Sequence, residues 1–312
     1  MHFPIHGGVL RRQTGAVLAV DGVSLRVKSG ETLGLVGESG CGKTTLGRCV
    51  LRLYEPSDGE VIFGGQNILA LGKEELRLIR RDLQMIFQDP FESLNSRHTI
   101  AEILMEPFVI HHMGTPAERK AQVEMLLTRV GLSGSALGRF PHEFSGGQRQ
   151  RVGIARAISL NPRMIVCDEP VSALDVSIQS QILNLLMDLQ RDMGLTYLFI
   201  AHDLAVVKHI SDRIAVMYLG KIVEYAGAHE IYNHPSHPYS VALISSIPVP
   251  DPAAKRNSRL ILRGDVPSPI SPPSGCRFHT RCPMADNRCI AEEPQLRAIN
   301  GNGAEEHLVA CH

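Results

Sequence analysis

The sequence contains no long apolar segment. Although 44% of its 312 residues are hydrophobic, no unbroken run approaches the roughly 20 apolar residues that a membrane-spanning helix needs. The chain therefore cannot form a transmembrane pore by itself. The start, MHFPIHGG, also lacks the basic region, the apolar stretch and the small-residue cleavage site of an export signal. We expect a protein of the cytoplasm.

The chain also has no excess of charge of either sign. Its 32 Lys and Arg residues balance 32 Asp and Glu residues. A general affinity for nucleic acid depends on positive charge that neutralises phosphates, so the balance argues against that function. No internal repeat is visible, and each motif described below occurs once.

The cysteines do not form the pattern of a disulfide framework. There are seven, an odd number, and Cys41, Cys49 and Cys167 lie among core segments. The other four are spaced C-x5-C-x6-C-x21-C near the end of the chain, at Cys276, Cys282, Cys289 and Cys311.

The segment around these four cysteines is rich in proline and has little apolar sequence for a core, so a metal would supply stability. Structural zinc sites use close C-x2–4-C pairs, which are absent here, whereas iron–sulfur clusters accept wider loops of four thiolates. We expect a [4Fe–4S] cluster, with zinc or no metal as the alternatives. Because the cysteines are distant in sequence from the phosphate motifs described below, we expect cluster loss to weaken assembly more than nucleotide binding.

Apolar periodicity indicates an α/β core. Continuous apolar runs predict buried strands at residues 32–36, 163–167 and 196–201, with shorter candidates around 61–63 and 83–87. Helical spacing predicts helices at residues 43–53, 116–129 and 176–193. The last helix lies between two buried strands, as in a βαβ unit. Beyond Tyr225 proline becomes frequent and periodicity is lost, so we place the end of the core near residue 228.

A P-loop joins the first strand to its helix. The segment matches G-x-x-x-x-G-K-[ST] with the residues Gly37, Glu38, Ser39, Gly40, Cys41, Gly42, Lys43, Thr44 and Thr45. Glycines let backbone N–H groups approach a β-phosphate, and the helix N-terminus adds positive potential. Lys43 can reach the β- and γ-oxygens, and the Thr44 hydroxyl can ligate Mg²⁺. The alternative, a glycine-rich turn that binds nothing, does not explain this position between strand and helix.

Two carboxylates follow the apolar strand RMIVC. The C-terminal end of a parallel strand is where open α/β sheets place their chemistry. Asp168 there can hold the Mg²⁺ shell, and Glu169 can polarise the water that attacks the γ-phosphate. The alternative, a solvated acidic strand end, is a weaker interpretation beside a P-loop. The two motifs together predict a P-loop NTPase.

Four further motifs lie at Phe144–Arg151, Gln88–Pro90, Ser172–Asp175 and His202. In this order they resemble the signature sequence, the Q-loop, the D-loop and the H-loop of the ATP-binding subunits of ABC transporters. The resemblance implies an ABC ATPase fold in which a partner ATPase binds part of each nucleotide. The residues that it implies for that shared site are Ser145, Gly146, Gly147 and Gln148.

The resemblance also implies roles for isolated side chains. Gln88 ligates Mg²⁺ or water, while the segment from Gln88 to Asn95 contacts the membrane subunit; His202 bonds the γ-phosphate. The alternative for a lone histidine at a strand end is a structural role. Adenine stacks on an aromatic residue before the P-loop, and Phe3 is the aromatic residue in that position. Since the sequence begins almost at Phe3, we expect a start further upstream or a missing edge strand.

More closely, the chain resembles the F-type ATPase of bacterial dipeptide and oligopeptide importers. The segments AVDGVSL, GESGCGKTTLGR, FQDPFESLN, HPSHPYSVALISSIP and GCRFHTRCP carry this resemblance. It departs at Phe144, Thr44 and Ser96, where leucine, serine and proline are commoner. The implied partners are a second ATPase, expected to be a different chain, two transmembrane permease subunits and an extracytoplasmic binding protein, with no nucleic acid. The implied location is the cytoplasmic side of the inner membrane, as a peripheral subunit.

These observations predict two domains. An ABC ATPase domain covers residues 1–228, with a helical subdomain at about 91–156, and a Cys-rich extension covers residues 229–312. The expected activity is ATP hydrolysis coupled to peptide uptake, with nickel or another solute as the alternative cargo. A soluble ABC ATPase of another class would have a coiled-coil insertion or two cassettes, and neither is present. A non-hydrolysing scaffold is disfavoured because Lys43, Glu169 and His202 are all retained.

Overall fold

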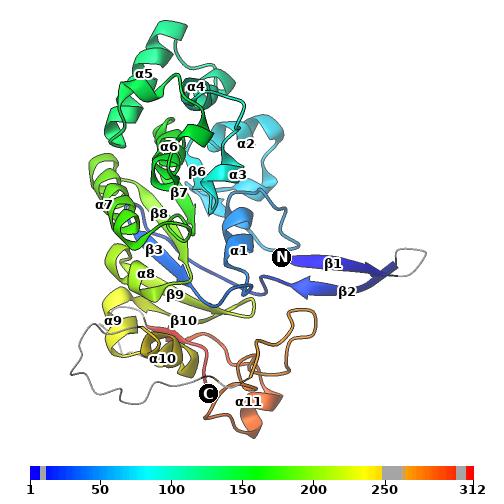
Figure 1. Cartoon of the computed structure of the whole chain (residues 1–312). Helices are drawn as coiled ribbons and strands as arrows, with labels where there is room; N and C mark the ends of the chain where they lie inside the picture. The colour runs from blue at the N-terminus through cyan, green and yellow to red at the C-terminus, as the bar shows by residue number, and fades with distance from the viewer. Residues whose placement is uncertain (8–11, 248–261, 263, 300–306) are drawn as a thin grey trace, which may run out of the picture. The chain divides into compact units, whose positions relative to one another are not determined.

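The computed structural model describes residues 1–7, 12–247, 262, 264–299 and 307–312. The chain divides into two compact units (Figure 1). The first unit consists of Met1–Arg26, Thr32–Gly59 and Ala201–His312, and the second of Val27–Glu31 and Glu60–Ile200. The first unit thus combines the P-loop with the C-terminal extension.

In the first unit, a mixed group of strands continues from the core into the extension. Strand β3 (Thr32–Val36) pairs in parallel with β9 (Arg213–Tyr218), which pairs antiparallel with β10 (Lys221–Gly227). The extension then adds β12 (Leu308–Val309) to β10 and β11 (Arg297–Ala298) to β12, both antiparallel. The extension is therefore continuous with the sheet and is not a separate appendage of that unit.

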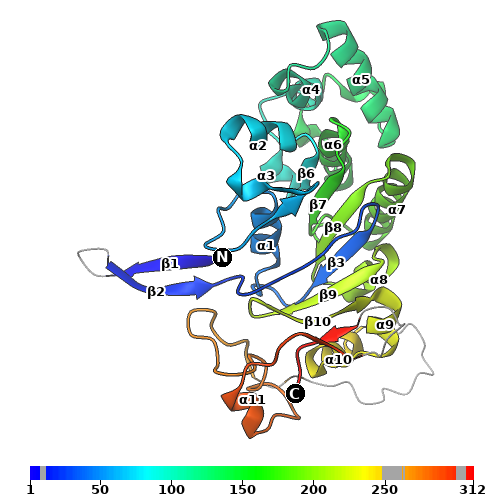
Figure 2. The ribbon, with the colours of Figure 1, turned by 180° about the vertical axis from the view of Figure 1, so that it is seen from behind.

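A hairpin and short helices complete the first unit. The hairpin consists of β1 (His2–Gly7) and β2 (Arg12–Leu18). The helices are α1 (Lys43–Val50), α8 (Leu204–Ile210), α9 (Ala228–Asn233), α10 (Pro238–Ser245) and α11 (Asn287–Ala291). Figures 1 and 2 show α10 beside β10 in both views.

The second unit has three parallel strands and a group of helices. Strand β7 (Met164–Asp168) pairs in parallel with β6 (Leu83–Ile86) on one side and with β8 (Thr196–Ala201) on the other. A short hairpin, β4 (Ile62–Phe63) and β5 (Gln66–Asn67), precedes them. The helices are α2 (Lys73–Ile79), α3 (Pro90–Ser93), α4 (Ile100–Ile110), α5 (Pro116–Arg129), α6 (Gly146–Ile158) and α7 (Val176–Met193). Helices α4, α5 and α6 contact one another.

Local signals explain several of these boundaries. Thr115 accepts the N–H of Glu118 at the start of α5, the side chain of Glu118 bonds back to the N–H of Thr115, and Pro116 occupies the first turn. Helix α7 ends at Gly194, whose φ of 64° is a left-handed conformation that glycine adopts without strain. The bounds of β3, β8, α5 and α7 are those predicted from the sequence. The parallel pairing of β7 with β8, the two strands that flank α7, confirms the predicted βαβ unit.

The aromatic side chains of the extension are buried against the preceding strands. Tyr239 is fully buried, and Phe278 and His237 are each 1% exposed. The rings of Tyr239 and Phe278 pack on Tyr218 of β9, and the ring of His237 packs on Phe278, so the extension completes a core that the preceding strands begin. Across the described residues, no helix is both long and apolar enough to span a membrane.

Candidate functional site

The P-loop, Gly37–Thr45, depends on glycine at two points of close approach. A Cβ atom at Gly37 would lie 2.1 Å from the carbonyl oxygen of Met217, and one at Gly42 would lie 2.0 Å from that of Ala19. Gly42 also has a φ of 109°, which L-residues rarely adopt. Glycine therefore allows the loop to wrap tightly before α1, the arrangement in which backbone amides can surround a phosphate.

The side chain of Lys43 is held by two backbone carbonyl groups of the P-loop. Its side chain is largely buried, and Nζ donates to the carbonyl oxygens of Gly37, at 2.7 Å, and Glu38, at 3.0 Å. Burial raises the pKa of the neighbouring Cys41 thiol, so that side chain stays neutral. Ser39 and Gly40 at the top of the loop are exposed, and Thr44 and Thr45 begin α1 with partial exposure. The cationic group thus lies within the P-loop, with the tip of the loop open to solvent.

Glu38 of the P-loop contacts two residues of the extension. Its N–H donates to the hydroxyl of Tyr239 at 2.9 Å. Both of its carboxylate oxygens accept hydrogen bonds from Arg281, at 2.7 and 3.0 Å. Two side chains of the extension that are distant from the phosphate motifs in sequence therefore contact the P-loop directly.

The two carboxylates predicted from the sequence lie at the end of β7 in the second unit. Asp168 is 2% exposed. Glu169 follows in a left-handed conformation, with a φ of 46°, and its N–H donates to the carbonyl oxygen of Ile200 at 3.0 Å. Non-glycine residues in this conformation concentrate at functional sites, where the surrounding structure maintains the strain.

Two neighbours orient Glu169. Gln88 Nε2 donates to its carboxylate at 3.1 Å, and the hydroxyl of Ser172 donates to its carbonyl oxygen at 3.0 Å. The structure therefore brings together the residues of the predicted Q-loop, catalytic and D-loop motifs within one unit. Gln88 itself is exposed.

Ser145 is the N-cap of α6. Its hydroxyl accepts the N–H of Gln148 at 3.3 Å, while Gln148 Oε1 accepts the N–H of Ser145 at 3.0 Å. A Cβ atom at Gly147 would lie 2.5 Å from Ile178, so this glycine permits close packing of α6 on α7. Ser145 and Gln148 are exposed and Gly146 is partly exposed, so the N-terminus of this helix faces solvent.

His202 and Phe3 belong to the first unit. His202 is exposed at the end of β8, directly before Asp203, which caps α8 by accepting the N–H of Ala205 at 2.7 Å. Phe3 lies in β1 and packs edge-to-face on Tyr54, with ring centroids 5.6 Å apart. It therefore lies within a hairpin strand. The first unit holds the P-loop, His202 and Phe3, and the second holds Gln88, Asp168, Glu169 and the signature residues.

The four late cysteines are partly exposed free thiols. Burial raises the pKa of Cys276, and the proximity of Cys289, Cys311 and Cys282 raises it further. The four side chains are thus near enough to interact electrostatically. Among the described residues, however, no three His, Cys, Asp or Glu side chains are placed to hold a single metal ion. The arrangement does not fit a preformed zinc site, in which all four sulfurs bond one ion at about 2.3 Å.

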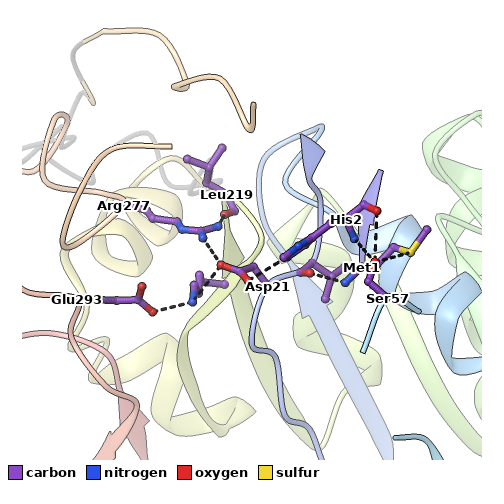
Figure 3. Close-up of polar contacts among 9 residues, drawn as sticks. Met1, His2, Asp21, Ser57, Leu219, Arg277 and Glu293 are labelled. Carbon is purple, nitrogen blue, oxygen red and sulfur yellow. Dashed lines mark hydrogen bonds and ion pairs between the residues drawn. The ribbon is translucent and has the colours of Figure 1, made fainter. Parts of the chain in front are cut away.

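A polar hub surrounds Asp21, shown in Figure 3, and could not be predicted from the sequence. Its carboxylate accepts from His2 Nε2 at 3.1 Å, pairs with Lys221 Nζ at 3.3 Å and bonds Arg277. Burial acts to raise the pKa of Asp21, but Lys221, His2 and Arg277 outweigh it and hold the pKa below its ordinary value. Lys221 also pairs with Glu293 at 2.6 Å. These partners lie too far apart in sequence for any spacing rule to connect them.

A second missed cluster surrounds Glu224 of β10, which is fully buried. Its carboxylate accepts the N–H groups of Ser236, at 2.7 Å, and His237, at 3.0 Å, and pairs with His307 Nε2 at 2.7 Å. The sequence signal for such a cluster is a glutamate within an otherwise apolar strand, since charged side chains are rarely buried without partners.

Comparison with known families covers both parts of the chain. The family described as "ABC transporter" matches residues 20–172. The family described as "Oligopeptide/dipeptide transporter, C-terminal region" matches residues 223–289. The first match includes the P-loop and the signature, and the second includes Tyr239 and Arg281.

Individual relatives match nearly the whole chain. The oligopeptide transport ATP-binding protein AppF of Bacillus subtilis is 56% identical over 316 residues, which cover 100% of this chain and 94% of the relative. The oligopeptide transport ATP-binding protein OppF of Salmonella typhimurium is 53% identical over 295 residues, covering 94% and 87%. Among solved structures, the dimeric post-hydrolysis state of the ATP-binding cassette MJ0796 bound to ADP and Pi matches with a TM-score of 0.64 and 29% identity, covering 73% of this chain and 98% of that one.

Proposed function

The chain belongs to the ABC transporter ATPases, and from that premise we propose that it powers the import of oligopeptides through separate membrane subunits. The observation that carries the proposal is the pairing of an intact P-loop, with Lys43 held inside it, and an extension of the oligopeptide/dipeptide type in the same compact unit. The cargo is proposed by similarity to AppF and OppF, which are oligopeptide transport ATP-binding proteins.

In this proposal ATP is bound by Phe3, by Gly37–Thr45 and, from the partner ATPase, by Ser145–Gln148. The oxygen ligands proposed for Mg²⁺ are Thr44, Gln88 and Asp168, a donor set that suits this hard cation. Glu169 orients and polarises the attacking water, and the hydrogen bond from Gln88 supports that role by fixing its carboxylate. Lys43 and His202 stabilise charge on the phosphates.

We propose that two ATPases share each nucleotide. The exposed N-terminus of α6 supports this, since Ser145 and the following amides are open to a ligand from another subunit. The solved structure of the ATP-binding cassette MJ0796, which is dimeric, supports it further. The proposed partners are a second, different ATPase chain, two permease subunits contacted by the Gln88–Asn95 segment, and an extracytoplasmic binding protein. The chain would then act at the cytoplasmic face of the inner membrane.

Reconstitution tests the function. The full chain, its partner ATPase and the permease are assembled in proteoliposomes, and ATP hydrolysis is measured with binding protein loaded with oligopeptides. We expect stimulation by peptide that Lys43→Ala abolishes, since the loss of this charge weakens nucleotide binding. Stimulation by nickel in place of peptide would change the cargo, and hydrolysis without any dependence on the permease would favour an ABC ATPase outside transport.

We also propose that Cys276, Cys282, Cys289 and Cys311 hold a [4Fe–4S] cluster. The mutual electrostatic influence of the four thiols supports the proposal, because a cluster spans a wider set of thiolates than one ion does. Anaerobically purified protein should contain iron and acid-labile sulfide, with visible absorption that Cys282→Ser abolishes. Stoichiometric zinc without sulfide would replace the cluster by a zinc site, and absence of both would end the metal proposal.

A further inference from the structure

The segment Cys276–Cys282, here called the brace loop, lies against the P-loop and the turn between β9 and β10. Three of its side chains make these contacts, and they are Arg277, Phe278 and Arg281. Phe278 is 1% exposed and packs on Tyr218 and Tyr239, with ring centroids 5.2 and 5.4 Å apart. The brace loop is therefore anchored by a buried ring with an arginine on either side.

Arg281 makes the direct contact with the P-loop. Its guanidinium donates two hydrogen bonds to the carboxylate of Glu38, a bidentate geometry that fixes direction as well as distance. The side chains are 7% and 28% exposed, so solvent screens this pair less than it screens a surface pair. The hydrogen bond to Glu38 raises the pKa of Arg281 above its ordinary value, so the arginine remains charged.

Every polar group of Glu38 is engaged. The carboxylate accepts from Arg281, the N–H donates to Tyr239, and the carbonyl oxygen accepts from Lys43 and from the N–H of Cys41. Two of these four partners belong to the C-terminal extension. The side chain of Glu38 is thus held from the extension, while its carbonyl oxygen is held from within the motif.

A second connection reaches the P-loop through the turn between β9 and β10. Arg277 donates to the carbonyl oxygen of Leu219 at 2.6 Å, and the N–H of Gly220 donates to the carbonyl oxygen of Cys41 at 2.9 Å. Gly220 has a φ of 82°, and a Cβ atom there would lie 2.8 Å from the carbonyl oxygen of Leu18. The brace loop therefore supports the P-loop at Glu38 directly and at Cys41 through this turn.

We propose that Arg281, assisted by Tyr239, is a positioning residue for nucleotide binding: by holding Glu38, it keeps the P-loop in its phosphate-binding conformation before ATP arrives. The physical basis is preorganisation, because a loop that is already ordered loses less conformational freedom on binding. This inference rests on the nucleotide-binding role proposed for the P-loop. It assigns the extension a part in ATP binding, in addition to any role in assembly.

The test compares ATP binding and hydrolysis in full-length variants. Arg281→Gln should weaken equilibrium binding of a fluorescent ATP analogue by about tenfold and raise the KM of the assembled transporter similarly, with kcat nearly unchanged. Arg281→Lys should recover part of the affinity because one charged donor remains. Arg288→Gln is the matched control, since it removes an exposed ion pair with Glu292 in the same extension and should leave KM unchanged.

A double-mutant cycle identifies the contact. Glu38→Gln and Arg281→Gln remove the same interaction. The double variant should therefore bind ATP no more weakly than whichever single variant has the lower ATP affinity. Fully additive losses would overturn the proposal, as would a lower kcat at unchanged KM, which is the signature of a smaller folded fraction. Should Arg281→Gln fail to fold, wild-type KM in both Tyr239→Phe and Glu38→Gln overturns it.

Lys43→Ala separates this inference from the proposed function. If Lys43→Ala loses ATP binding and Arg281→Gln retains it, the positioning role is wrong and the P-loop assignment stands. If Lys43→Ala binds ATP normally, the P-loop assignment itself is wrong. The two variants therefore test the positioning role of Arg281 and the nucleotide-binding role of the P-loop separately.

Discussion

The P-loop and the C-terminal extension belong to one compact unit but are stabilised over different sequence distances. Lys43 is held by Gly37 and Glu38, within the nine residues of its own motif. In the extension, Arg281 pairs with a residue 243 positions away, and Arg277 with one 256 positions away. The comparison teaches that a motif can be recognised locally while the contacts that support it come from the far end of the chain.

The largest expected effect concerns chemistry without loss of structure. Glu169→Gln should lower ATP hydrolysis by roughly 10² to 10⁴ and retain ATP affinity, because a positioned base is lost while the P-loop is unchanged. Turnover of the assembled transporter measures it, with nucleotide binding as the control. Hydrolysis at the wild-type rate would show that Glu169 does not polarise the attacking water. It would also weaken the contrast between motifs that carry the chemistry and an extension that supports the structure.

A change in the extension should instead affect stability. Glu224→Ala leaves the buried N–H of His237, the partly buried N–H of Ser236 and the buried His307 ring without their acceptor, so the free energy of unfolding should fall by about 3 to 5 kcal/mol. Denaturant unfolding measures the difference. Glu292→Ala, which removes an exposed pair with Arg288, should cost less than about 1 kcal/mol. Equal costs for the two variants would show that the buried cluster adds nothing specific.

The extension should also carry a pH dependence. Burial lowers the pKa of His237 to about 4, so the neutral ring contributes stability that is fully present above about pH 6.5. That contribution is lost as the pH falls toward 4, at a total of up to about 3 kcal/mol. Unfolding at a series of pH values measures it, and His237→Asn, which retains a capping side chain, should lack this component. An identical pH slope in both proteins would contradict the assignment.

The smallest expected effect is on binding within one subunit. Ser145→Arg should leave ATP affinity of the isolated chain within about twofold, because the signature is proposed to act on the nucleotide of the partner. The assembled transporter should nevertheless lose ATP-driven closure, which crosslinking across the two ATPases can follow. Equal loss of affinity in the isolated chain and the complex would contradict a shared site.

The parts of the fold that could be predicted from the sequence are those with short-range causes. Strand β3, strand β8 and helix α7 follow from apolar runs and helical spacing, and α5 begins at a capping box with proline in its first turn. The brace loop could not be predicted, because periodicity carries no information on pairs such as Arg281 and Glu38. For the same reason the packing of Phe278 on Tyr218 and Tyr239 could not be predicted.

Strand β12 has a consequence for association between molecules. It bonds along β10 at Glu224 and Tyr225, and Ala310 donates to Val223 at 2.8 Å, so it covers the backbone groups of a largely buried strand. Among the described residues, the strand outside it is β11, whose two residues are exposed, and so short an edge is a poor template for further pairing. Removing β12 would expose the backbone groups of β10 at Val223, Glu224 and Tyr225, and the expected result is self-association of the chain through strand addition at that edge.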